Sequence, residues 1–369
     1  MKLSSILGRY LSKQIIITFL LVLSTIMGII MMFDAIEALR RISGREDVGM
    51  NYVVEYVITR LPQTIDKVLP FIMMVASMIT FWKVSKNNEY VIIRSSGVSV
   101  WGFLTPVLLT VFVVGVINVA LINPISSKMY EMHETIKYRF VTKNPNAMLF
   151  SSKGLWIREA TDDDKVLVLQ AKSLRQTEDE ILSMQDVIIL EMDRQSQIVK
   201  RVEALLGELR DNKLKLRGVK IFESGKEITS IAQTEYDTGI NLERIKENFI
   251  DPDAISVWEL PETIKFYESS GFSADRHKMR YLSLLASPFL LIAMVLISSL
   301  FALKPSMRQG GVMFLIVAGI TTGFVIYFSS QLIYAFGING YIPIWVAVWS
   351  PSLIVALLGI SAMIHKEEA

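Results

Sequence analysis

The chain has 369 residues, of which 51% are hydrophobic, and its mean hydropathy is +0.41. A soluble protein of this length is rarely so apolar on average, so the composition places the chain in the membrane class. The absence of cysteine excludes disulfides, thiol catalysis and cysteine-ligated metals. Basic and acidic residues are interspersed and sum to a net charge of +2, which gives no indication of nucleic-acid binding.

The first part of the chain contains three apolar runs, at 15–33, 61–82 and 101–122. About 20 apolar residues in a helix span a hydrocarbon core of about 30 Å. The residues before the first run include three basic side chains and no acidic one, which favours a cytoplasmic N-terminus. No small-residue cleavage site follows this run, so we expect it to remain as a helix. Residues 1–122 are therefore predicted to hold transmembrane helices 1–3.

A polar block follows, from 123 to 280. It opens with a helix-like stretch, 126–140, and continues as short runs with period-2 alternation, separated by Gly, Asp and Asn. These runs are LFSSKGLWIRE, KVLVLQAKSL, DVIILEM, IVKRVEALLGELR, KLKLRGVKIFE and EITSIAQTEYD. Strands without intervening helices predict a small sandwich or jelly roll. The sequence DPD ends this region, and 257–270 is typical of an amphipathic helix.

Three further apolar runs, 281–303, 311–336 and 342–364, make up transmembrane helices 4–6 within residues 281–369. Six spans and a cytoplasmic N-terminus place both termini inside and the polar block outside. We therefore predict an α-helical membrane protein with six transmembrane helices, three before and three after an inserted extracytoplasmic β-jelly-roll domain at 123–280.

The sequence contains no GxxxxGK[ST] phosphate loop and no GxSxG nucleophile elbow. The three histidines are far apart and form no HExxH motif, so we predict no catalytic residue, no metal site and no cofactor. An ATPase that drives this protein would be another polypeptide. It would act on the longest inner loop, 83–100, where a short helix with Glu89, Tyr90, Ile92 and Ile93 could insert into a cleft of the partner. An ordinary solvated loop is the alternative.

Two groups of basic residues lie at predicted outer ends of spans. Arg40 and Arg41 follow the first apolar run, and Arg276, Lys278 and Arg280 precede the fourth. Guanidinium groups match phosphate oxygens two at a time, so these residues could hold the phosphates of an anionic amphiphile. The alternative is that they anchor the helix ends to lipid headgroups.

Several stretches occur in the order and spacing of a known family. They are GRYLSK at 8–13, FDAIEALRR at 33–41, NNEYVIIRSSG at 87–97, KGLWIRE at 153–159, DPDAIS at 251–256, SSG at 269–271 and GFVIYFSSQ at 323–331. With its three-plus-three helices, nearly the whole chain resembles the permease subunits of the lipopolysaccharide exporter, the LptF/LptG family, with the LptG branch favoured.

The resemblance implies a heterodimer with a second permease of the family in the bacterial inner membrane, driven by a cytoplasmic ATPase dimer that binds the ATP. Lipopolysaccharide would leave the outer leaflet of that membrane and pass to a single-span jelly-roll bridge protein. The coupling helix would meet the ATPase through Glu89, Tyr90, Ile93 and Arg94. The lipid phosphates would be held by Arg40, Arg41, Arg276, Lys278 and Arg280. The sequence departs from the family pattern at Asp34 and Gln63, where we expect lysines.

Other function classes remain as alternatives. A six-span sensor or scaffold with an external ligand-binding domain would share the topology but would transport nothing. An intramembrane enzyme would need paired acids or a Ser/Lys group in its spans, and only Asp66 and Lys67 lie near an edge of one. A lipoprotein exporter would place its large domain after the first helix rather than the third.

Overall fold

The computed structural model describes residues 2–42, 50–141, 147–151, 154–160, 166–176, 182–192, 198–210, 213–223, 227–237, 251–269, 272–303 and 312–368. The chain divides into two compact units. The first unit comprises residues 1–136, 256–258 and 278–369, and the second comprises residues 137–255 and 259–277. Each unit is described separately.

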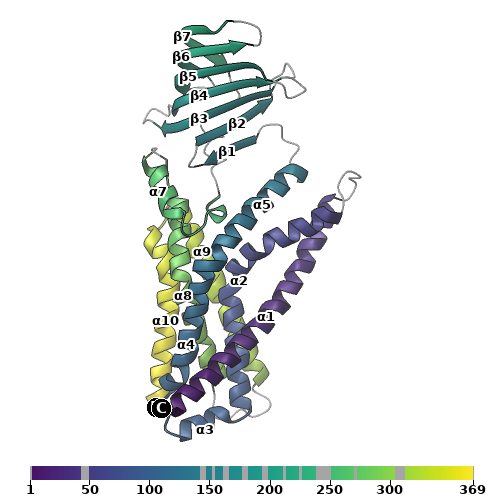
Figure 1. The fold of residues 1–369 in the computed structure, drawn as a ribbon. Coiled ribbons are helices and arrows are strands. Elements are labelled where there is room, and N and C mark those ends of the chain that lie inside the picture. The colour runs from purple at the N-terminus through teal and green to yellow at the C-terminus, as the bar shows by residue number, and fades with distance from the viewer. Residues whose placement is uncertain are drawn as a thin grey trace. The chain divides into compact units, whose positions relative to one another are not determined.

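The first unit is built from long helices (Figure 1). Their bounds are α1 Lys2–Ile42, α2 Met50–Lys86, α3 Glu89–Ser95, α4 Val100–Ile117, α5 Asn123–Val141, α8 Asp275–Ala302, α9 Val312–Ile338 and α10 Ile344–Glu368. Within the described residues, six helical segments are long and apolar enough to cross a membrane. Three of these segments precede the strands and three follow them, so the predicted three-plus-three arrangement is confirmed.

The helices extend beyond the predicted apolar runs. Helix α1 has 41 residues, which at 1.5 Å per residue is about twice the thickness of a hydrocarbon core. The third span does not end at Asn123-Pro124 as the sequence suggests. A π-helical turn, Asn118–Ile122, joins α4 to α5, so the helix continues past Pro124.

Pro124 has no N–H, so this residue donates to no carbonyl of the turn. In an α-helix the amide of residue 124 would donate to the carbonyl of Ala120. The indole Nε1 of Trp258 donates to that carbonyl at 3.2 Å. Beside it, the backbone N–H of Val257 donates to Oδ1 of Asn123 at 2.8 Å. The short segment 256–258, which follows the strands in sequence, is thereby fastened to the π-helical turn.

The core of the first unit lies where α2, α4 and α8 meet. Phe81, Phe103 and Leu291 are fully buried in one apolar cluster. Helix α4 approaches α8 closely at Gly115, where a Cβ would stand 2.8 Å from the Cα of Pro288. Small residues allow such close backbone approach between membrane helices. The second and fourth spans are accordingly the most buried, with 67% and 61% of the residues in their most apolar windows inside the protein.

The described strands of the second unit form one antiparallel sheet. Its strands are β1 Ala147–Ser151, β2 Gly154–Ala160, β3 Val166–Gln176, β4 Leu182–Met192, β5 Ile198–Arg210, β6 Lys213–Glu223 and β7 Thr229–Asp237. The predicted inserted β domain is confirmed. Each strand pairs with the next in sequence, from β1 at one edge to β7 at the other (Figure 1). The described strands thus form a meander, whereas a jelly roll in the strict sense requires Greek-key crossovers.

The sheet is creased along one row of residues. The row comprises Lys172, Asp186, Leu205, Gly218 and Ala232, which stand opposite one another on β3 to β7. Pairing is interrupted at each of them, although the register is the same on both sides. Asp186 and Gly218 have φ of 51° and 66°, in the left-handed region. Such residues bend a strand locally, as β-bulges do.

The crease shifts the alternation of buried and exposed side chains by one position. In β4, Leu182 and Met184 are buried before the crease, and Val187 and Ile189 are buried after it. Strands β5 and β6 show the same shift, with two consecutive exposed residues at the crease. Because the shift coincides with the bend, both halves of the sheet turn their apolar side chains toward one core.

Helix α7, Leu260–Ser269, contributes to this core of the second unit. Tyr267 is 1% exposed, and Phe272 and Ala274 after the helix are also buried in the cluster. The ring of Tyr267 lies 4.5 Å from that of His277, which is buried at the start of α8. The predicted amphipathic helix at 257–270 therefore exists in a slightly shorter form and covers part of the sheet.

Candidate functional site: the α3 helix, the α1 arginine pair and the polar contacts between helices

The short helix α3 connects the second and third spans, in the loop where the sequence predicts a coupling helix (Figure 1). It starts after Asn88, whose left-handed φ of 58° turns the chain out of α2. Ser99 ends the loop, and its Oγ accepts a hydrogen bond from the N–H of Gly102 in the first turn of α4. Both ends of the loop are thus fixed by local backbone geometry and capping.

The carboxylate of Glu89, the first residue of α3, is held on both of its oxygens. The hydroxyl of Tyr10 on α1 donates to Oε2 at 2.9 Å. The side-chain amide of Asn87 donates to Oε1 at 3.1 Å. An ionised carboxylate has about four acceptor positions, so these two bonds orient Glu89 and leave room for a basic group of a partner.

The other predicted coupling residues face different ways. Tyr90 is 5% exposed, and its ring packs edge-on against Phe103 of α4 with centroids 5.4 Å apart. Ile93 and Arg94 are half-buried, and Nη1 of Arg94 donates to the carbonyl of Val98 at 3.3 Å. The structure therefore gives these three residues contacts within the chain. Tyr90 in particular anchors α3 to α4.

The outward side of α3 is apolar. Ile92 is 62% exposed and Val91 is 40% exposed. Val91 was not among the residues predicted for this contact, because the exposed face of a seven-residue helix cannot be read from its sequence. These two residues, with Glu89 beside them, form the outward surface of α3.

The α1 arginine pair, Arg40 and Arg41, lies in the last turn of α1 and shares one acid. Oε2 of Glu37 lies 2.9 Å from Nη2 of Arg40, and Oε1 lies 3.0 Å from Nε of Arg41. The Arg40 side chain is 77% exposed, whereas that of Arg41 is 34% exposed and stands over the ring of Tyr56 at 5.8 Å. One carboxylate against two guanidinium groups leaves a net positive charge, and Arg40 is the member that an anion can reach.

Further polar contacts near the arginine pair join α1, α2 and α5. Oδ1 of Asp34 on α1 lies 2.8 Å from Nη1 of Arg60 on α2. Nδ1 of the buried His133 on α5 lies 3.3 Å from the Thr59 hydroxyl and 3.2 Å from the carbonyl of Tyr56. Asp34, which replaces an expected lysine, is thus a partner of a basic residue within the chain.

The predicted basic cluster at the start of α8 is divided. Arg276 is exposed and belongs to the second unit, whereas the half-buried Lys278 and Arg280 belong to the first. Nη2 of Arg280 lies 3.5 Å from Oδ2 of Asp66 on α2. The other oxygen of Asp66 accepts from the side-chain amide of Asn118 at 3.0 Å, at the start of the π-helical turn. Arg280 is therefore engaged with the spans themselves.

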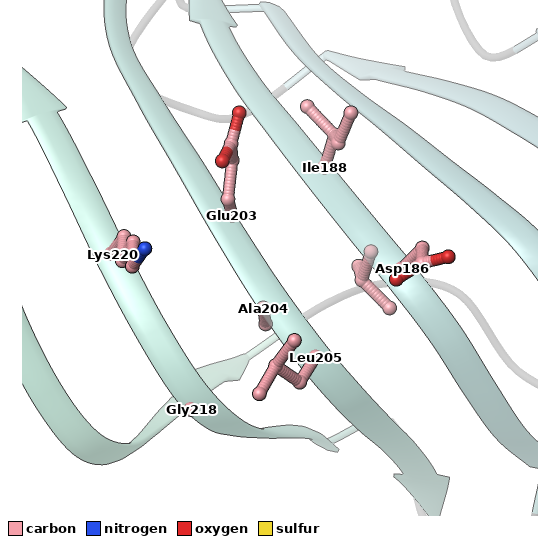
Figure 2. A pocket seen from close by; sticks show the side chains of 8 residues that line it. Asp186, Ile188, Glu203, Ala204, Leu205, Gly218 and Lys220 are labelled. Carbon is pink, nitrogen blue, oxygen red and sulfur yellow. The ribbon is translucent and has the colours of Figure 1, made fainter.

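A hollow of about 310 Å³ lies at the crease of the sheet in the second unit. Figure 2 shows Asp186, Glu203 and Lys220 on three neighbouring strands, with Leu205 beside Gly218. The lining carries two carboxylates and one ammonium group, so it offers no site for an anionic lipid phosphate. Within the described parts of the chain, no three His, Asp or Glu side chains are grouped so that they could hold a metal ion.

Comparison with known proteins identifies a family that matches nearly the whole chain. The family described as lipopolysaccharide export system permease LptF/LptG matches residues 9–365. The lipopolysaccharide export system permease protein LptG of Escherichia coli strain K12 is 22% identical over 358 residues, covering 96% of this chain and 94% of that protein. LptG of Escherichia coli O6:H1 gives the same values.

These relatives share the branch that the sequence favours, and the match extends over all six candidate spans and all seven strands. The family expectation is therefore confirmed: the chain belongs to the lipopolysaccharide export system permease family LptF/LptG.

Proposed function

We propose that this permease extracts lipopolysaccharide from the outer leaflet of the inner membrane, with a second family member beside it and a cytoplasmic ATPase dimer as the motor. The observation that carries the proposal is the uneven burial of the spans. In their most apolar windows, 22% of the first span, 28% of the third and 11% of the fifth are buried, against 67% for the second. Among the described spans, these three expose most of their apolar surface to contacts outside this chain, and the fifth and first expose the most.

The exposed side chains on these spans suit acyl chains and a partner helix. Leu20, Leu21 and Ile29 of α1 and Phe324, Val325 and Phe328 of α9 are at least half exposed. Lipid tails against these faces would leave the lipid phosphates near the end of α1. There the α1 arginine pair supplies a net positive charge, with Arg40 open to an anion.

The sheet suits the next step of the path, transfer toward a bridge protein. Burying each CH₂ is worth about 0.8 kcal/mol, so a lipid with several acyl chains leaves a bilayer only when another apolar surface replaces it. Ile231 on β7 pairs with Val219 across the inward face and is 40% exposed, so part of this face is open at the β7 edge. The edge strands β1 and β7 are also where a strand of the bridge protein would pair.

The motor would act on the outward surface of α3. Val91 and Ile92 offer the apolar contact, and Glu89, held by Tyr10 and Asn87, offers the oriented charge. ATP binding to the motor would move α3, and the spans attached to it would narrow the space that holds the lipid.

Purification of the tagged chain from detergent-solubilised membrane, followed by mass spectrometry of proteins and lipids, tests this function. Recovery of a second six-span permease, a soluble ATPase and lipopolysaccharide is the expected result. Recovery of the chain with ordinary phospholipid and neither protein would contradict the proposal and would favour the six-span sensor.

A further inference from the structure

The attachment of α3 to the first span is a separate matter from its contact with a motor. The bond from the Tyr10 hydroxyl to Glu89 joins residues 79 positions apart in the sequence. Tyr10 lies on α1, which the sequence separates from α3 by the whole of α2. A motion of α3 therefore has a direct polar route to α1 in addition to the covalent route through α2.

Helix α1 is also tied to α4 near this end, but by contacts that do not involve α3. The hydroxyls of Thr110 and Ser12 share a hydrogen bond at 2.7 Å, and Oγ1 of Thr110 also lies 2.8 Å from the carbonyl oxygen of Pro106. One turn earlier, a Cβ at Gly8 would stand 3.4 Å from the Cβ of Pro106, which is ordinary packing distance. The Ser12–Thr110 bond thus provides a control contact at the same end of α1, a side-chain hydrogen bond between two neutral hydroxyls with no link to Glu89.

Helix α1 joins this end to the α1 arginine pair. It runs without interruption from Lys2 to Ile42. Tyr10 and Arg40 are separated by about 45 Å along its axis, at 1.5 Å for each residue between them. Near the other end, the Asp34–Arg60 ion pair at 2.8 Å holds α1 to α2. A displacement of Tyr10 would therefore be carried along one continuous helix, which is held to α2 near the arginine pair.

We propose that Tyr10 is a positioning residue that transmits the motion of α3 to the first span and so to the α1 arginine pair. The inference rests on the proposed function, because it assumes that a motor moves α3. It adds the path by which the motion travels within this chain, from the Glu89 carboxylate of α3 to the Tyr10 hydroxyl and then along α1. Loss of the phenolic hydroxyl should disconnect ATP hydrolysis from lipid movement without preventing the motor from binding.

The test uses the complete complex, with the motor and second permease, reconstituted in vesicles that contain purified lipopolysaccharide. ATP hydrolysis and lipopolysaccharide release are measured in the same sample. For Tyr10→Phe we expect hydrolysis close to that of the unaltered complex and a fall of about ten-fold in lipid released per ATP, the scale of one lost hydrogen bond to a charged group. Ser12→Ala, the matched control, should leave the ratio unchanged.

A double-variant cycle shows whether Tyr10 acts through Glu89. Tyr10→Phe combined with Glu89→Ala should be no worse than Glu89→Ala alone, because both remove the same contact. Additive losses would overturn the inference, as would a Tyr10→Phe complex with an unchanged ratio or one in which hydrolysis and release fall together.

Failure of the inference is distinguishable from failure of the proposed function. If Glu89→Lys stops lipid release while Tyr10→Phe releases lipid normally, only the route through Tyr10 is wrong. If Glu89→Lys also releases lipid normally, α3 does not receive the motor's motion, and the proposed function of this helix is wrong as well.

Discussion

Arg280 and Asp66 form an ion pair between the fourth and second spans, with Nη2 of the arginine 3.5 Å from Oδ2 of the aspartate. The two side chains are 13% and 3% exposed. Asn118 completes the group by donating to the other oxygen of Asp66. Two of the partners, Asn118 and Arg280, precede and follow the inserted β domain in sequence, and the contact joins the second, third and fourth spans.

Breaking this pair from one side should be costly. Asp66→Asn leaves the Arg280 charge partly buried without its carboxylate, a change that typically costs about 3–5 kcal/mol. We expect a clear fall in the thermal unfolding midpoint of the detergent-solubilised chain. The double variant Asp66→Asn with Arg280→Gln should recover most of the loss. A midpoint unaffected by Asp66→Asn would show that the pair contributes nothing to stability.

The two members of the α1 arginine pair should differ. Arg40→Gln should reduce photo-crosslinking of lipopolysaccharide without lowering the unfolding midpoint, because the side chain is 77% exposed and its described ion pair is with Glu37, which keeps Arg41 as a partner. Arg41→Gln should lower both, since it also loses its position over Tyr56. Lys13→Gln, an exposed cation at the other end of the same helix, is the control. If the Arg40→Glu, Arg41→Glu double variant crosslinks to lipopolysaccharide as well as the unaltered chain does, the two arginines do not bind its phosphates and only anchor the helix end to lipid headgroups.

The outward surface of α3 should be needed for the motor to bind. Ile92→Asp places a charge where the motor would meet an apolar side chain, so we expect the ATPase to be lost from the purified complex. The chain itself should remain folded, because Ile92 is 62% exposed. Ile228→Asp alters an isoleucine of matching exposure, 61%, in the second unit, and should retain the ATPase. Loss of the ATPase in both variants, or in neither, would contradict this role.

The crease should depend on its left-handed residues. Gly218→Ala puts a Cβ at a φ of 66° and 2.9 Å from Cδ1 of Leu205, and left-handed strain alone costs about 1–2 kcal/mol. Asp186→Gly, at a φ of 51°, relieves such strain. Hydrogen exchange of the β5 and β6 amides should therefore quicken in the first variant and slow or stay level in the second. Unchanged exchange after Gly218→Ala would mean that the backbone relaxes at no cost.

Much of this architecture could be predicted from the sequence. Apolar length alone reveals a membrane span, and period-2 alternation reveals a strand, so the six spans and the strands from KGLWIRE to TEYD were predictable. The crease was not. The crease is marked by two consecutive exposed residues in a strand. In β5 these residues are Leu205 and Leu206, and leucine in a strand is normally expected to be buried.

The site was predictable in its location but not in its contacts. In the sequence, a basic residue at the end of a span such as Arg280 suggests lipid binding. The structure shows instead that it forms an ion pair with Asp66 of α2, which the sequence does not reveal. Asp34 looked like a departure from the family pattern until Arg60 was found opposite it. Tyr10 lies in the GRYLSK stretch, but its bond to Glu89 could not be predicted, because hydrogen bonds between distant helices leave no spacing in the sequence.

ATP-driven transfer of lipopolysaccharide from vesicles to a jelly-roll acceptor, measured for the unaltered complex and for Glu89→Lys, tests the central claim most directly. Reversing this charge removes the acceptor for Tyr10 and repels the basic group that Glu89 would meet on the motor. We expect transfer in the unaltered complex and none in the variant, with the variant still folded in the membrane. Equal transfer in both would contradict the claim, because a motor that drives extraction through α3 needs this carboxylate.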